Sequence, residues 1–234
     1  MIKYFTNIKI QSIFCLLIST IFSTGNSQSI EEAYFKLISS IETQQEKNRF
    51  DFINSSFEEK GKIVLKARGY LIDVLANEIF PYWYGTPWDF YGQTEVPGKG
   101  KIACGYFVTH TLSALGFNIP KKKWAQLASE VMMKKFIKNK LKRFSNVHIS
   151  VIREYIKKSG EGIYLVGLDS HVGYIIYIND EIKFVHSNYY QPEIGVMSEN
   201  IEGWNPLNDS KYRVIGKLFS DEMIINWLTQ KTYN

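Results

Sequence analysis

Cysteine is scarce in this sequence. Only Cys15 and Cys104 occur among its 234 residues, and Cys15 lies inside an apolar N-terminal stretch. If that stretch is removed, one thiol remains, which excludes an internal disulfide. The remaining thiol is then either buried and inert or reactive.

Several other patterns are missing as well. Basic residues exceed acidic ones by only 28 to 23, a balance that indicates no nucleic-acid partner. We find no internal repeat and no low-complexity tract, and beyond the N-terminal stretch no apolar run is long enough to span a membrane. With 45% hydrophobic and 22% charged residues, the composition is that of an ordinary globular domain.

The first 27 residues have the pattern of a signal peptide. Lys3 and Lys9 give a positive start, residues 10–22 are apolar, and small polar residues follow. The apolar run is about 13 residues long, too short for a membrane-spanning helix. We therefore predict export to the periplasm or the extracellular space, with cleavage after Gly25 or Ser27 and no stable membrane insertion afterwards. The alternative is a buried N-terminal helix.

Hydrophobic periodicity predicts that the next part of the chain is helical. Apolar residues recur at helical spacing in a region that we place at 28–79. Residues 80–101 lose this periodicity and hold three prolines and four glycines, which predicts a long loop of the kind that is often functional. Further helices are expected at 106–115, 124–136 and 149–156.

Strand patterns dominate the second half. Runs rich in β-branched and aromatic residues predict strands at 163–168, 172–178, 182–186 and 212–219. Ser220 then has the character of an N-cap for a last helix. Helices followed by an antiparallel sheet indicate the α+β class. We expect the N-terminal helical region, 28–79, to precede a domain that spans 80–234.

Cys104 stands where the long loop meets the helix predicted at 106–115. A thiol at a helix N-terminus feels the positive end of the helix dipole, which lowers its pKa and favours the nucleophilic thiolate. Gly105 would let a substrate approach the backbone closely. The alternative is that Cys104 is a small buried side chain in the first turn.

Four histidines accompany this thiol. A cysteine hydrolase needs one imidazole to accept the thiol proton and a third group to hold that imidazole. His110 falls in mid-helix and His148 starts a helix, so we expect a packing role and a surface role for them. His171 opens one predicted strand and His186 closes the next, which makes these two the candidates.

A two-residue turn at 179–180 would bring His171 and His186 together. Residues that face each other across such a hairpin have numbers that sum to 359, so His186 would oppose Gly173. His171 then becomes a diagonal neighbour of His186 on the same face, at about 7–8 Å between backbones. A three-residue turn would place the two histidines on opposite faces.

Four motifs between Pro81 and His186 follow one another in a recognisable order. They are Pro81-Tyr82-Trp83-Tyr84-Gly85-Thr86, Ala103-Cys104-Gly105-Tyr106-Phe107-Val108, Ser170-His171-Val172-Gly173 and Phe184-Val185-His186-Ser187. In this order and spacing the chain resembles the NlpC family of papain-like cell-wall cysteine peptidases. The resemblance implies a papain-like α+β fold, with N-terminal helices packed on a central antiparallel sheet and the nucleophile at a helix N-terminus.

The resemblance also implies roles for four residues. Cys104 matches the nucleophile, His171 the base and His186 the third polar residue. Tyr82 matches a tyrosine near the nucleophile whose hydroxyl could help to stabilise an oxyanion, although it could equally be a packing residue. The implied substrate is an amide bond in a peptidoglycan stem peptide or a related amide, cleaved through a thioester acyl-enzyme. No metal or organic cofactor is implied.

The chain departs from the family pattern at three positions. Ala103, Gly105 and Thr86 stand where the family has Asp, Ser and Gly. In the family the Asp and Ser positions help to shape the pocket for the substrate, so these departures concern the choice of substrate more than the catalytic residues. A non-catalytic cell-wall binding module and an acyltransferase on the same fold stay open as alternatives.

A basic cluster follows within residues 134–143. It could attract anionic cell-wall polymers, but such a run is more often a solvated helix face. Its members are Lys134, Lys135, Lys138, Lys140, Lys142 and Arg143.

Overall fold

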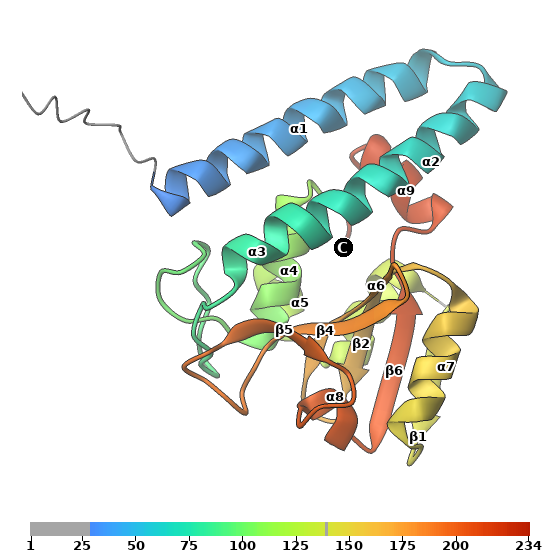
Figure 1. Ribbon diagram of the computed structural model, residues 1–234. Coiled ribbons are helices and arrows are strands. Elements are labelled where there is room, and N and C mark those ends of the chain that lie inside the picture. Colours follow the sequence, from blue (N-terminus) through green and yellow to red (C-terminus); the bar gives the residue numbers. More distant parts are fainter. Residues whose placement is uncertain (1–28, 139) are drawn as a thin grey trace, which may run out of the picture.

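The computed structural model describes residues 29–138 and 140–234. The predicted signal peptide, 1–27, and its cleavage sites lie outside these residues. Helices come first in the described chain, and a six-stranded antiparallel sheet follows (Figure 1). The predicted α+β class is therefore confirmed.

Two long helices form an antiparallel hairpin beside the sheet (Figure 1). Helix α1 spans Ile30–Asn54 and α2 spans Phe57–Asp73. Each begins with a capping box, in which a serine side chain accepts from a glutamate N–H and the glutamate carboxylate accepts from the serine N–H. The pairs are Ser29 with Glu32 and Ser56 with Glu59.

Helical structure continues beyond the point where the sequence periodicity stops. After α2 the chain forms a π-helix, Val74–Ile79, and then α3, Phe80–Trp83. The wider π turn accommodates Pro81, which lacks the N–H that an uninterrupted α-helix needs there. The loop predicted to begin at residue 80 therefore begins at Tyr84, and that part of the prediction is wrong.

The sheet has the strand order β1-β6-β2-β3-β4-β5. The four predicted strands correspond to β2, β3, β4 and β6. The sequence missed β1 and β5, the two edge strands, because most of their residues are polar and exposed or half-buried, so that neither strand forms an apolar run. The strands are β1 (Lys142–Ser145), β2 (Gly162–Leu168), β3 (Val172–Ile178), β4 (Glu181–Ser187), β5 (Val196–Asn200) and β6 (Tyr212–Lys217).

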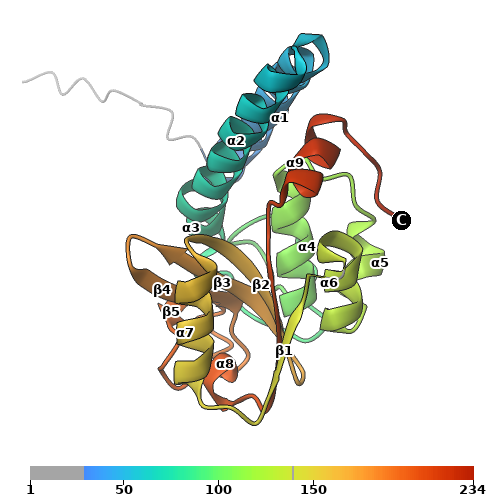
Figure 2. The ribbon, with the colours of Figure 1, turned by 90° about the vertical axis from the view of Figure 1, so that its right-hand side faces the viewer.

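Helices cover both faces of the sheet (Figure 2). Helix α7 (Ile149–Ser159) packs on one face, and α4 (Cys104–Ala114) packs on the other. Alternate residues of β2 serve the two sides, since Val166 joins the core under α7 and Leu165 the core under α4. Every residue of β2 is buried for this reason.

The helix predicted at 124–136 is two helices, α5 (Lys121–Ala125) and α6 (Ser129–Ile137). The ring centroids of Trp124 and Phe136 lie 4.7 Å apart in the core. A straight helix would separate two residues twelve positions apart by about 18 Å along its axis. The break between α5 and α6 is what lets both rings enter one core.

The remaining predicted helices are present. Helices α4 and α7 include the predicted ranges almost completely, and Gly116, at φ +91°, follows the end of α4. Helix α9 spans Asp221–Leu228, and the Ser220 side chain caps it by accepting from the N–H of Met223. A short helix, α8 (Pro206–Asp209), precedes β6.

The helical hairpin shares its core with the sheet domain. Ile41 of α1 and Leu71 of α2 are fully buried in the same cluster as Phe107 of α4. Trp83 Nε1 donates a hydrogen bond to the Tyr34 hydroxyl at 3.1 Å. Residues 29–79 therefore pack as a continuous part of the body that holds the candidate site.

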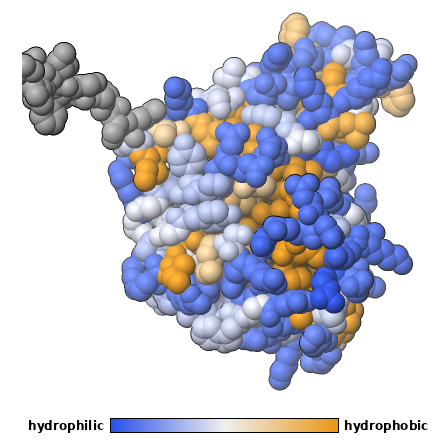
Figure 3. Space-filling view, in the orientation of Figure 1, coloured by the Kyte–Doolittle hydropathy of each residue, from blue (hydrophilic) through white to orange (hydrophobic). Residues whose placement is uncertain are grey.

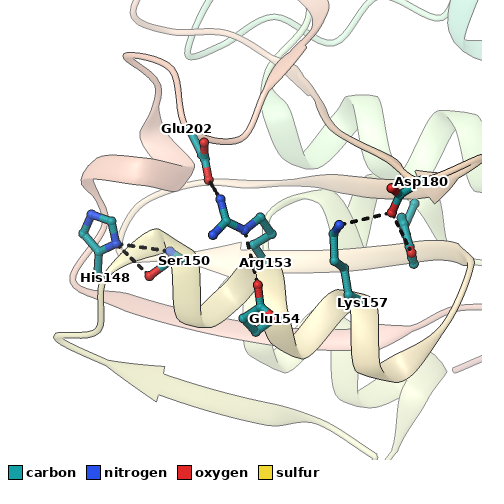
Figure 4. A network of polar contacts seen from close by, with 8 residues as sticks. His148, Ser150, Arg153, Glu154, Lys157, Asp180 and Glu202 are labelled. Carbon is teal, nitrogen blue, oxygen red and sulfur yellow. Dashed lines mark hydrogen bonds and ion pairs between the residues drawn. The ribbon is translucent and has the colours of Figure 1, made fainter.

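The outer side of α7 carries a row of polar contacts (Figure 4). His148 caps the helix by accepting from the Ser150 N–H, and Arg153 pairs with Glu202 across to the loop after β5. The basic cluster at 134–143 is also partly paired, since Lys134 and Arg143 contact Glu130, and Lys138 contacts Glu222. Lys134 and Lys135 lie in α6, whereas Lys142 and Arg143 belong to β1, so the cluster is solvated and partly paired but is not one helix face.

Apolar side chains also reach the surface at the far end of the helical hairpin (Figure 3). Phe50, Ile53, Phe57 and Leu65 are all exposed there. No helix among the described residues is both long and apolar enough to cross a membrane.

Candidate active site

Cys104 is the first residue of α4, where backbone N–H groups have no partner within the helix. The N-cap is Ala103, whose methyl side chain cannot accept a hydrogen bond. Serine side chains occupy the same position at α1 and α2. The first turn of α4 is thus open to an outside acceptor. Donors at such a place suit an oxyanion that develops beside the thiol.

Gly105 allows α5 to pack directly on the first turn of α4. A Cβ at this position would lie 2.1 Å from the carbonyl oxygen of Ala125, far inside contact distance. The segment 125–128 can therefore form one wall beside Cys104. The close approach that this glycine permits is to the protein's own backbone, and not to a substrate as the sequence suggested.

Strands β3 and β4 form the predicted hairpin. Paired residues such as Tyr174 and Val185 have numbers that sum to 359. Asn179 and Asp180 form the turn with φ values of 52° and 62°, the left-handed values of a type I′ turn. A Cβ on Gly173 would lie 2.9 Å from the Cβ of His186, so the glycine leaves room for that ring.

His171 and His186 are in contact. His171 Nε2 lies 2.8 Å from His186 Nδ1, and both side chains are buried. Phe184 stacks on the His186 ring, with 4.0 Å between centroids. His171 stands just before β3, at the end of the sheet, so its ring lies between His186 and the hollows that contain Cys104.

Glu199 extends this pair to a chain of three side chains. It lies on β5, next to β4, and its Oε1 is 2.7 Å from His186 Nε2. The three groups bond one another in a line. Within residues 29–138 and 140–234, no three such side chains converge on a point as metal ligands would.

The thiol and His171 line the same hollows, but no hydrogen bond joins them within the described part of the chain. Burial raises the pKa of the Cys104 thiol, and nearby backbone N–H groups, that of Val172 foremost, only partly offset this. The lowered pKa expected from the helix dipole is therefore wrong for this state. Catalytic contacts often tighten only when a substrate binds.

Burial also lowers the pKa of both histidines. The pKa of His171 lies well below its ordinary value, and that of His186 falls to about 3. The resting site thus combines a neutral thiol with two neutral imidazoles. A neutral imidazole is the form that can accept a proton from the thiol.

One hollow beside Cys104, of about 670 Å³, is aromatic and uncharged. Trp88, Phe90 and Tyr91 of the long loop form part of its wall, and Tyr189 lies opposite Trp88 with 6.0 Å between ring centroids. Within the described ranges, no Lys, Arg, Asp or Glu lines this aromatic groove.

A second hollow, of about 580 Å³, also contains Cys104 and is lined in part by Glu130 and Asp169. Arg143, with Lys134 and Tyr212, holds the pKa of Glu130 at about 2. Asp169 accepts hydrogen bonds from the backbone N–H groups of the segment 211–212. Both carboxylates are therefore engaged in structural contacts.

Tyr82 is not among the described residues that line either hollow. It lies in α3, and its ring packs against Tyr34 of α1 with 5.4 Å between centroids. The structure therefore brings Cys104, His171 and His186 together and leaves Tyr82 apart from them. This placement favours the packing alternative for Tyr82.

We expect Tyr82→Phe to change kcat by less than about twofold, because the ring contact with Tyr34 is kept and only a hydroxyl is lost. Steady-state kinetics of the folded variant, verified by circular dichroism, would check this. A decrease in kcat of tenfold or more would instead indicate that the Tyr82 hydroxyl helps to stabilise the oxyanion.

The other two histidines have the predicted roles. His110 is buried in α4 with Nδ1 3.0 Å from the Thr94 carbonyl oxygen, and burial lowers its pKa to about 4. His148 is the exposed N-cap of α7. Asn188, two residues beyond His186, accepts from the Tyr190 N–H and so shapes a turn instead of contacting His171.

Comparison with known protein families, curated proteins and solved structures finds no match for this chain. The resemblance to the NlpC family therefore rests on the four sequence motifs.

Sequence reasoning missed two residues of the site. Glu199 belongs to an edge strand that was not predicted, and its polar neighbours give no separate signal. Trp88 belongs to the predicted loop, where the run Trp88, Phe90 and Tyr91 was a usable sign, since exposed aromatic residues on a loop are typical of binding surfaces.

Proposed function

We propose that this protein is a cysteine hydrolase that cleaves an amide bond through a thioester acyl-enzyme. His171 takes the proton of Cys104, and the thiolate attacks the carbonyl carbon. The C–N bond breaks as the amine leaves with that proton. His171 then takes a proton from water, the hydroxide attacks the thioester, and the acid is released as the thiol is restored.

The observation that carries this proposal is the position of His171. Its Nε2 is bonded to His186, so Nδ1 is the ring atom left to accept the thiol proton. Its ring lines the same two hollows as Cys104, which stands at an uncapped helix N-terminus. A nucleophile, a base and a group that orients the base are the three parts that this chemistry requires.

The proposed substrate is a peptidoglycan stem peptide or a related amide, on the strength of the motif resemblance to NlpC cell-wall peptidases. The aromatic groove supports an extended peptide or sugar-linked peptide, because planar rings give contact area at low cost in conformational entropy. The proposed site of action is outside the cytoplasm, in line with the N-terminal sequence pattern.

Digestion of purified peptidoglycan tests this proposal. Mass spectrometry should detect fragments with a new amine and a new carboxylate for the wild type but not for Cys104→Ala. Hydroxylamine should intercept the thioester as a hydroxamate. Equal binding by both proteins without cleavage would instead identify a binding module, and transfer of the acyl group to an added amine in preference to water would identify an acyltransferase.

The absence of charged side chains from the described lining of the aromatic groove predicts a preference among substrates. A stem peptide whose carboxylate nearest the scissile bond is amidated should be cleaved roughly tenfold faster, in kcat/KM, than the peptide with a free carboxylate, because the groove offers that charge no cationic partner. Competition between the two peptides in one reaction would measure the ratio. A preference for the free carboxylate would show that the substrate's acidic part lies elsewhere.

A further inference from the structure

The contact between His186 and Glu199 bears on which nitrogen of each imidazole carries its hydrogen. His186 uses both nitrogens, with Nδ1 2.8 Å from His171 Nε2 and Nε2 2.7 Å from Glu199 Oε1. In a neutral imidazole one nitrogen donates and the other accepts. The protonation state of Glu199 therefore determines the hydrogen positions along the whole chain.

An ionised Glu199 can only accept, so His186 must donate to it from Nε2. Nδ1 of His186 then has a lone pair and accepts from His171 Nε2–H. A neutral His171 with its hydrogen on Nε2 has a free lone pair on Nδ1. This is the tautomer that can take a proton from Cys104.

A protonated Glu199 permits the reverse of every step, because its carboxyl has gained a donor. Its O–H donates to His186 Nε2, and His186 Nδ1–H donates to His171 Nε2. The hydrogen of His171 must then stand on Nδ1, so that nitrogen cannot accept the thiol proton. The same two contacts thus support an active and an inactive arrangement that differ by one proton on Glu199.

We propose that Glu199 is a positioning residue that completes a Cys104–His171–His186–Glu199 chain and, when ionised, sets His171 in the tautomer that can act as a base. This inference rests on the proposed function. It assigns a role that the motif resemblance does not contain, because the resemblance ends at His186.

The surroundings of Glu199 suit a group that titrates near neutral pH. Burial raises its pKa to about 7, and the Asn205 side chain offsets this only in part. The groups that face the carboxyl are His186 of β4 and the Asn205 amide after β5. Neutral His186 supplies no compensating charge, because burial keeps its own pKa at about 3. Base function should therefore appear as pH rises through 7.

The rate at which iodoacetamide alkylates Cys104 gives a test that needs no substrate. In the wild type the rate should rise through an inflection near pH 7 as Glu199 ionises. Glu199→Gln should lack this inflection and react roughly tenfold more slowly at pH 8, because a neutral amide can donate as well as accept and no longer fixes His171 in the tautomer that can act as a base. Peptide-resolved mass spectrometry would follow the Cys104 peptide alone.

Glu202→Gln is the matched control. Glu202 lies three residues further on, and its carboxylate pairs with Arg153 on the surface. Its alkylation profile should coincide with that of the wild type. Coincident profiles for wild type and Glu199→Gln would overturn the proposal. If the profile of Glu199→Gln is altered but no cell-wall peptide is hydrolysed, the role of Glu199 stands and the proposed hydrolase activity is refuted.

A second measurement uses the wild type alone, in case Glu199→Gln does not fold. Imidazole ¹⁵N chemical shifts report which ring nitrogen carries the hydrogen. His171 and His186 should exchange tautomers together as pH crosses 7. Tautomers that stay unchanged between pH 5 and pH 9, while the protein remains folded, would refute the role of Glu199.

Discussion

Replacing either Cys104 or His171 with alanine should remove nearly all hydrolysis, with each change lowering kcat by roughly 10³-fold or more. Cys104→Ala removes the nucleophile. His171→Ala removes the base and leaves a thiol whose pKa is raised by burial, so little thiolate would form at neutral pH. The double variant should be scarcely worse than either single one, because members of a catalytic unit are strongly non-additive.

Substitution of His186 should lower turnover less than substitution of Cys104 or His171. The His186 ring orients His171 and does not line either hollow beside Cys104 in the described chain. His186→Asn or His186→Gln keeps a hydrogen-bonding group and should retain measurable turnover, and His186→Ala should fall between these and His171→Ala.

Steady-state kinetics on a cleavable cell-wall peptide would establish this order. His148→Gln, at the exposed N-cap of α7, is the matched control and should match the wild type. Wild-type activity in a folded His186→Ala variant would show that His171 needs no partner. Wild-type activity in His171→Ala would remove the basis of the proposed mechanism.

Gly105→Ser should destabilise the fold by about 3 kcal/mol, at the upper end of overpacking effects. The new Cβ would lie 2.1 Å from the Ala125 carbonyl oxygen, and backbone cannot rotate away as a side chain can. The substitution restores the serine that the NlpC pattern has after its nucleophile. Loss of stability in this variant would show that glycine follows Cys104 because α5 packs against the first turn of α4.

Urea unfolding would measure this change. Gly69→Ser is the control, because a Cβ at that helical position meets nothing within 4 Å, and it should be neutral or stabilising by about 0.5 kcal/mol. Unchanged stability in Gly105→Ser would mean that α5 moves aside at little cost, and the groove wall at 125–128 would then be adaptable.

The parts of the fold that the sequence predicts well are those with strong local signals. Strands β2 and β3 are nearly continuous apolar runs, and Ser220 is a typical N-cap residue at the start of α9. The two-residue turn at 179–180 fixes the register of the β3–β4 hairpin, and that register predicts His171 and His186 as diagonal neighbours on one face, where the structure shows them in contact.

Features that depend on tertiary contacts were beyond the reach of sequence patterns. The break between α5 and α6 exists because two rings, Trp124 and Phe136, must meet in one core. The thiol pKa depends on how deeply the fold buries Cys104, an effect that opposes the local helix dipole. Glu199 acquires its neighbour through the pairing of β4 with an edge strand whose sequence carries no strand signal.

The long loop is tied to the strand that carries Glu199. Gly85 and Thr86 exchange backbone hydrogen bonds with Val196, the first residue of β5, and the Trp88 N–H donates to the Pro192 carbonyl oxygen. The loop that forms the aromatic wall of the groove is therefore paired with β5, the strand that carries Glu199.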